Sequence, residues 1–197
     1  MPTAEDGIKT YQTPFQRHLS FFDRDGDGII YYGDSLRGNL SLGIDFPVAA
    51  VMAFGYHAIY GNSGSVLYGP LRPINVHAVT SQRNQLETIR ADTIPTEGMT
   101  RQALVEAARP TGLLDRAHVL GLWALAANKQ KLISKHDIQA FQQGTMFYEL
   151  AARRRDNRDH VLPLYRGGPA WVGGHSYVVD KLFGVKVYQL DDSMKSR

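Results

Sequence analysis

The feature that most constrains the fold is a twelve-residue acidic loop that spans Asp23–Asp34. Acidic residues stand at its positions 1, 3 and 5, a glycine at position 6 and an apolar residue at position 8, which is the pattern of an EF-hand cation loop. Such a loop lies between two helices and binds its ion through hard oxygen ligands. The donors of the first seven positions are the carboxylates of Asp23, Asp25 and Asp27 and the backbone carbonyl of Ile29.

The last position of the loop departs from the usual pattern. Position 12 holds Asp34, where a glutamate usually reaches the ion with both oxygens. The aspartate is one methylene shorter, so it favours single-oxygen coordination and a six-coordinate site. We therefore expect Ca²⁺ as the ion, with Mg²⁺ as the alternative, held more weakly than in a sensor site. Asp34 completes the predicted metal ligands.

A second helix–loop–helix pattern follows later in the chain, at residues 126–137. It has Ile133 at the apolar position and Asp137 at the end, but it lacks the first acid, and Lys131 replaces the glycine. Lys129 adds a further positive charge. We expect a metal-free, degenerate hand that packs Ile133 against Ile30.

The rest of the chain predicts a mainly α fold. Its 197 residues with 43% hydrophobic content are enough for one cored domain, residues 1–197. Thr13-Pro14 indicates a helix start. Further helices are expected at 34–42, 46–60, 100–108, 116–127 and 137–154. The expected organisation is a functional hand (13–45), an apolar segment with a reduced proline knot (46–75), a degenerate hand (116–150) and an irregular, aromatic-rich C-terminal extension (151–197).

Composition and charge exclude several functions. The 22 basic and 19 acidic residues give a net charge of +3, and there is no long basic run or nucleic-acid-binding motif, so we expect no nucleic-acid partner. The absence of cysteine excludes disulfides and thiolate-ligated metal. Arg153–Arg155 is interpreted as a solvated helix end, with contact to an anionic lipid or substrate as the alternative.

The apolar segment 46–60 bears on localisation. It is shorter than the roughly 20 residues that a spanning helix needs, which favours an interfacial or core helix. The N-terminus is polar and shows no secretory signal. We expect a cytoplasmic protein, with peripheral association with a membrane or a lipid droplet as the alternative.

The histidines are the candidates for redox chemistry, because without cysteine a haem must be held by His, Tyr or Met. Among the seven histidines, His18 is distinguished by its place on the apolar face of the helix that enters the cation loop. No close metal-binding pair such as HExxH is present.

The run from His18 to Tyr31, HLSFFDRDGDGIIY, resembles the caleosins, the peroxygenases of plant and fungal lipid droplets. Four later blocks resemble the family in order and spacing, and the resemblance covers roughly residues 13–150. These blocks are Pro70–His77 (the proline-knot exit), Gly121–Trp123, Leu132–Lys135 and Phe141–Tyr148.

The resemblance implies a haem enzyme that transfers one oxygen atom from a fatty-acid hydroperoxide to an acceptor. Two histidines serve the haem in that family, and His18 matches the first. Ser81 stands where the second is expected. Either His77 is the second ligand, or His18 alone holds the haem, or haem is not bound. The resemblance thus makes His18 and His77 the candidate catalytic and haem b ligands.

Three functions follow as alternatives. The first is a haem peroxygenase acting on an apolar lipid or secondary metabolite. The second is a haem-free enzyme that performs acid–base isomerisation, cyclisation or ring opening. The third is a non-catalytic, Ca²⁺-binding protein of lipid-droplet surfaces. The departures from the family pattern favour a divergent, short, fungal-type member in specialised metabolism. Substrate identity and oligomeric state stay open.

Overall fold

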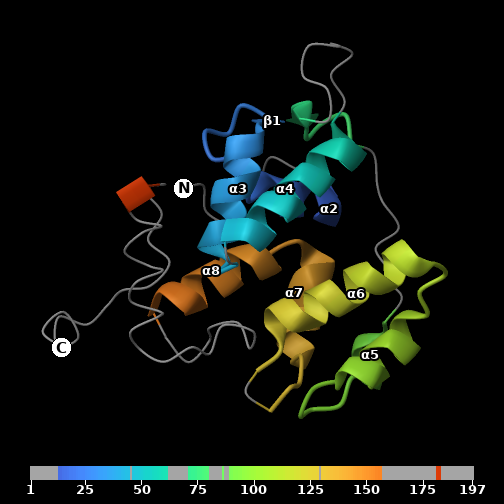
Figure 1. Cartoon of the computed structure of the whole chain (residues 1–197). Coiled ribbons are helices and arrows are strands. Elements are labelled where there is room, and N and C mark those ends of the chain that lie inside the picture. Colours follow the sequence, from blue (N-terminus) through green and yellow to red (C-terminus); the bar gives the residue numbers. More distant parts are fainter. Residues whose placement is uncertain are drawn as a thin grey trace, which may run out of the picture.

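The fold is mainly helical, as the sequence predicted, in a computed structural model of the chain (Figure 1). The structure describes residues 13–44, 46–61, 71–79, 86, 89–128, 130–156 and 181–182. Its helices are α2 (Pro14–Ser20), α3 (Tyr32–Ser41), α4 (Phe46–Tyr60), the 3₁₀ turn η3 (Ala91–Thr93), α5 (Arg101–Ala108), α6 (Leu113–Ala126), α7 (Lys135–Gln143) and α8 (Met146–Asp156). The strands are β1 (Ile29–Ile30) and β2 (Ile74–Asn75).

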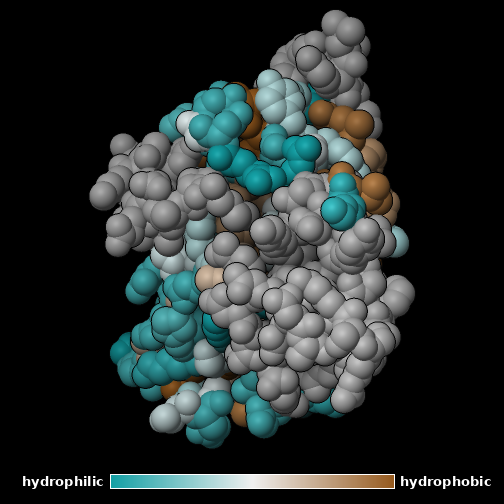
Figure 2. All heavy atoms as spheres, turned by 90° about the vertical axis from the view of Figure 1, so that its left-hand side faces the viewer, coloured by the Kyte–Doolittle hydropathy of each residue, from teal (hydrophilic) through white to brown (hydrophobic). Residues whose placement is uncertain are grey.

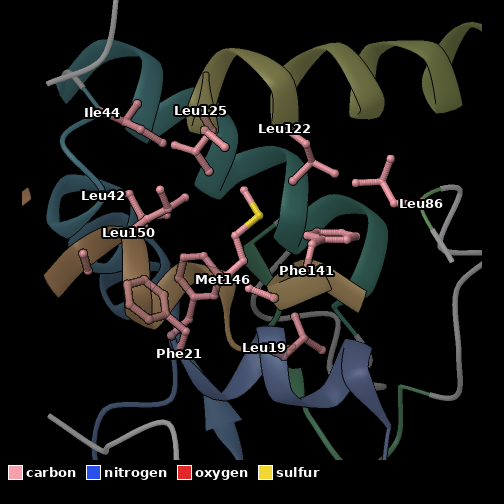
Figure 3. Packing of buried hydrophobic residues seen from close by; sticks show 14 of the residues in the cluster. Leu19, Phe21, Leu42, Ile44, Leu86, Leu122, Leu125, Phe141, Met146 and Leu150 are labelled. Atoms are coloured by element: carbon pink, nitrogen blue, oxygen red, sulfur yellow. The ribbon is translucent and has the colours of Figure 1, made fainter. Parts of the chain in front are cut away.

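The helices form two groups around one apolar core. Figure 1 shows α2, α3 and α4 towards one end and α5, α6 and α7 towards the other, with α8 beside both. Residues of both groups belong to one cluster of buried hydrophobic side chains. Figure 3 shows Leu19 of α2, Leu122 of α6 and Met146 of α8 pointing into the same space. The core therefore connects the cation loop's helices to the second group.

Helix α2 begins where the sequence predicted. The Thr13 hydroxyl accepts a hydrogen bond from Gln16 N at 3.1 Å, and Thr13 N donates to Gln16 Oε1 at 3.3 Å, which is a capping box. Pro14 occupies the first turn, where its missing N–H costs no helical bond. The helix has a fixed start just ahead of the cation loop.

Short antiparallel backbone pairings close both loops, and each loop has its own partner. β1 pairs with β2, so that Ile30 lies opposite Ile74. Ile133 of the second hand instead forms a bridge with Met99, just before α5. Ile133 and Ile30 therefore do not pair through their backbones, although both side chains are buried in the same core cluster.

The single helix expected at 137–154 is two helices. Gly144 ends α7 in the left-handed conformation, with φ at 84°, and its N–H bonds to the carbonyls of the preceding turn. A Cβ at Gly144 would lie 2.6 Å from the Pro14 carbonyl oxygen and 2.6 Å from Arg17 Cβ. Only glycine fits both the backbone angle and this close approach, so the break also provides the surface on which α2 docks.

The interpretation of Arg153–Arg155 as a solvated helix end was wrong for Arg154. Its side chain is 2% exposed, and its guanidinium donates to the carbonyls of Leu42, after α3, and Leu125, near the end of α6. Arg153 forms an ion pair with Asp137. Arg154 thus binds the carboxyl ends of two other helices, where the macrodipole favours a cation.

Several predictions fall on residues outside the described part of the chain. These are the proline-knot residues 62–70, Ser81, and the C-terminal extension except for the end of α8 and residues 181–182. Among the described helices, none combines the length and the apolar character needed to cross a membrane.

Candidate metal centre and the environments of the histidines

Three of the predicted ligands form a cluster. Asp23, Asp25 and Asp27 can each offer one carboxylate oxygen within 4.8 Å of the other two. The turns that bring them together need φ values of 75° at Gly26 and 82° at Gly28, which glycine adopts without strain. A set of hard carboxylate oxygens fits Ca²⁺ or Mg²⁺. The cluster could hold a metal ion.

Backbone donors hold this cluster in place. Asp23 is buried, and its two oxygens accept from Gly26 N and Gly28 N, each at 3.0 Å. Asp27 Oδ1 accepts from Ile29 N at 2.7 Å. The hydrogen bonds fix the carboxylates but leave like charges close together, so a bound cation would relieve their repulsion.

The other two predicted ligands lie differently. Ile29 stands in β1, opposite Asn75. Asp34 lies at the third position of α3, where Oδ2 accepts from Tyr31 N at 3.0 Å and Oδ1 lies 3.8 Å from Arg37 Nη1. The Asp34 carboxylate therefore caps the exit helix and does not belong to the trio.

His77 belongs to the cation loop's surroundings. The side chain is exposed, and its ring lies over Gly28: a Cβ built there would be 3.0 Å from His77 Cδ2 and 3.1 Å from Nε2. Its backbone N–H donates to Asn75 Oδ1 at 3.0 Å, in the turn that follows β2.

His18 lies in the core instead. Its Nε2 is 2.8 Å from the Phe141 carbonyl oxygen, so Nε2 carries the proton and donates. The ring stacks on Phe141 at 4.3 Å and meets Phe147 at 4.8 Å between centroids. Burial lowers the pKa of His18 to about 4. The hydrogen bond to the Phe141 carbonyl raises this pKa, and the nearby His118 and Arg17 lower it further by smaller amounts. The imidazole is neutral at pH 7, and its buried Nδ1 has no hydrogen-bond partner in the described part of the chain.

The described residues do not fit a haem at His18. A neutral imidazole with one nitrogen bonded to a carbonyl and the other free has the donor chemistry of an iron ligand. Nδ1 is, however, buried with no exposed surface, so there is no room beside it for a macrocycle. His77 lies at the cation loop, with its ring over Gly28.

His57 is a residue that sequence reasoning did not single out. It is buried in α4, where Nδ1 lies 2.6 Å from the Arg72 carbonyl oxygen and Nε2 lies 3.0 Å from Ser35 Oγ. Since Nδ1 must donate to the carbonyl, Nε2 accepts from the serine. Burial lowers the pKa of His57. A signal was available, because His57 follows the buried Ala49 and Ala53 at helical spacing.

Helix α4 buries its small residues and a histidine and exposes its large apolar residues. Its buried positions are Ala49, Ala53 and His57, whereas large apolar residues are exposed. Figure 2 shows hydrophobic surface in the upper part of the molecule, the end at which Figure 1 places α4. We define the apolar face of α4 as the exposed Phe46, Val48, Val51, Phe54 and Ile59.

Fold and site together define a mainly helical protein with a carboxylate-lined helix–loop–helix. Residues 10–94 match the family model Caleosin, described as caleosin related protein, and this segment holds the cation loop, α4 and β2. This part of the chain is caleosin-related. The family implies Ca²⁺ as the ion of the acidic cluster. No solved structure matches the chain.

Proposed function

We propose that this protein binds Ca²⁺ and docks on the surface of a lipid phase through the apolar face of α4. The observation that carries the proposal is the exposure of the large apolar residues of α4: Val51 is 72% and Ile59 61% exposed, while the buried positions hold Ala49, Ala53 and His57. Exposed apolar patches of this kind mark interaction sites. A helix that lies in a lipid interface presents such an apolar face to the acyl chains.

Two exposed side chains in segments that adjoin α4, one just before α3 and one bonded to α4 through its backbone, suit a lipid interface. Tyr31, which is exposed, precedes α3, and Arg72, also exposed, follows the exposed Leu71. Tyrosine and arginine are suited to the headgroup level, where an apolar body meets water and phosphate.

Flotation with phosphatidylcholine vesicles in the presence of Ca²⁺ tests the proposal. Val51→Asp should reduce vesicle binding at least about tenfold, because it places a charge in the acyl boundary. Leu113→Asp is the matched control: Leu113 is 84% exposed but starts α6 in the other group of helices, and this variant should bind as the wild type does. Equal binding by both variants would contradict the proposal.

A second candidate function is the peroxygenase activity that the family resemblance implies, with a hydroperoxide as oxygen donor and an apolar lipid or secondary metabolite as acceptor. The neutral His18 with its unbonded Nδ1 favours it. It requires haem b, and the core around the buried Nδ1 must then open to admit it.

An absorption spectrum of the purified protein separates the enzymatic alternatives. A Soret band that His18→Ala abolishes supports the peroxygenase. A colourless protein that turns over an apolar substrate without peroxide supports the haem-free acid–base enzyme instead.

A further inference from the structure

Residues 71–79, here called the strap, are bonded to the cation loop. β2 lies in the strap and pairs with β1, and Val76 N donates to the Gly28 carbonyl at 2.9 Å. The ring of His77 covers Gly28 at the distances given above, so a side chain at Gly28 would push the imidazole aside. The strap therefore follows the backbone of loop positions 6 to 8.

The same strap is bonded to α4. The Arg72 carbonyl accepts from His57 Nδ1 at 2.6 Å. The end of α4 also approaches the strap closely, since a Cβ at Gly61 would lie 2.7 Å from Arg72 Cβ. His57 Nε2 in turn accepts from Ser35, the residue directly after Asp34. His57 thus joins α4, α3 and the strap in the interior.

We propose that the strap and His57 couple the occupancy of the cation loop to the lipid-docking face of α4, with His57 and His77 as positioning residues; this inference rests on the proposed function. An ion bound by Asp23, Asp25 and Asp27 fixes the backbone from Gly28 to Ile30. The strap is paired with that backbone and holds the end of α4 through His57. Cation binding therefore orders the helix that enters the lipid.

Linkage makes the inference quantitative, because the coupling between two sites is reciprocal. If Ca²⁺ raises the affinity for vesicles by some factor, vesicles must raise the affinity for Ca²⁺ by the same factor. We expect a factor of at least about fivefold for the wild type. Zwitterionic phosphatidylcholine vesicles are the appropriate probe, because Ca²⁺ cannot then act by bridging acidic groups to an anionic surface.

The experiment measures Ca²⁺ affinity by calorimetry with and without these vesicles. His77→Ala, an exposed substitution, should reduce the coupling factor towards one, and His57→Gln should do the same if circular dichroism shows a folded protein. His136→Ala is the matched control: His136 is an exposed histidine on α7, bonded to Glu149, and the variant should keep the wild-type factor.

The outcomes separate the two proposals. If His77→Ala and His57→Gln keep the coupling factor of the wild type, only the coupling proposal is overturned. The same holds if the wild type binds vesicles but has a coupling factor of one. A wild type that does not bind vesicles at all, with or without Ca²⁺, would overturn the proposed function and the coupling with it.

Discussion

The cation loop and the loop of the second hand have the same helix–loop–helix arrangement, but their polar groups form different hydrogen bonds. Both lie between two helices, and each makes one short antiparallel backbone contact. In the cation loop, Asp23 accepts two backbone N–H groups. In the second loop, the Asn128 side chain accepts from Leu132 N at 3.0 Å, and its backbone N–H donates to the Leu132 carbonyl at 2.9 Å.

This difference explains why an ion is expected to stabilise only one of the two loops. The second loop is closed by neutral hydrogen bonds, and Lys131 makes its tight turn with φ at 61° and brings a positive charge. The first loop uses glycines for its turns and gathers three carboxylates. A cation therefore stabilises the first loop, whereas it would meet like charge in the second.

The largest expected effect comes from removing the charge on the buried ligand. Asp23→Asn keeps the shape of the side chain but loses a carboxylate, so we expect the Ca²⁺ dissociation constant to rise about 100-fold. Isothermal titration calorimetry measures it. Asp92→Asn serves as the control, because Asp92 is an exposed aspartate outside the loop, and this variant should bind Ca²⁺ as the wild type does. Similar losses of affinity in both variants would contradict the assignment of Asp23 as a metal ligand.

The second prediction concerns His18, which joins the cation loop's entry helix to α7 through the Phe141 carbonyl. Its pKa is about 4 in the folded protein against 6.5 in the unfolded chain. The unfolded chain thus takes up the proton first, and stability that is complete above pH 6.5 declines as the pH falls towards 4, by about 3 kcal/mol. Urea unfolding of His18→Phe between pH 7 and 4.5 should show a shallower loss than the wild type. An identical pH slope would contradict this account.

The third prediction concerns position 12 of the loop. Asp34 caps α3 in this structure, and a longer arm could reach the trio. We expect Asp34→Glu to tighten Ca²⁺ binding about tenfold and to favour Ca²⁺ over Mg²⁺. Competition between the two ions in calorimetry measures the selectivity. Unchanged selectivity would mean that position 12 does not reach the ion.

The smallest effect is expected in the second loop. Lys131→Gly should raise the free energy of unfolding by up to about 1 kcal/mol, because glycine adopts the positive φ of this turn without strain. Lys131→Ala keeps the strain and should leave the stability close to that of the wild type. Thermal unfolding of both variants provides the measurement, and a stabilised alanine variant would show that charge rather than backbone angle limits this turn.

The features that the sequence predicted correctly are those that depend on residues close together in the chain. The helix start at Thr13-Pro14 and the bounds 46–60 of α4 were confirmed, because caps and continuous apolar runs act over a few residues. The acid spacing from Asp23 to Asp27 likewise predicted the carboxylate cluster that the structure shows.

The features that sequence reasoning missed depend on contacts between distant segments. The pairing of Ile30 with Ile74, the burial of Arg154 and the bond from His57 to Arg72 each join parts of the chain that local patterns treat separately. Gly144 could have been recognised as a helix end, since glycine is common there.

Titration of the wild-type protein with Ca²⁺ tests the central claim most directly. The difference between the two loops predicts one ion per chain, with binding weakened by Asp23→Asn and unaffected by Lys131→Gly. A second ion per chain that Lys131→Gly tightens, or no binding at all in the wild type, would contradict the assignment of the Asp23, Asp25 and Asp27 cluster as the cation site of this protein.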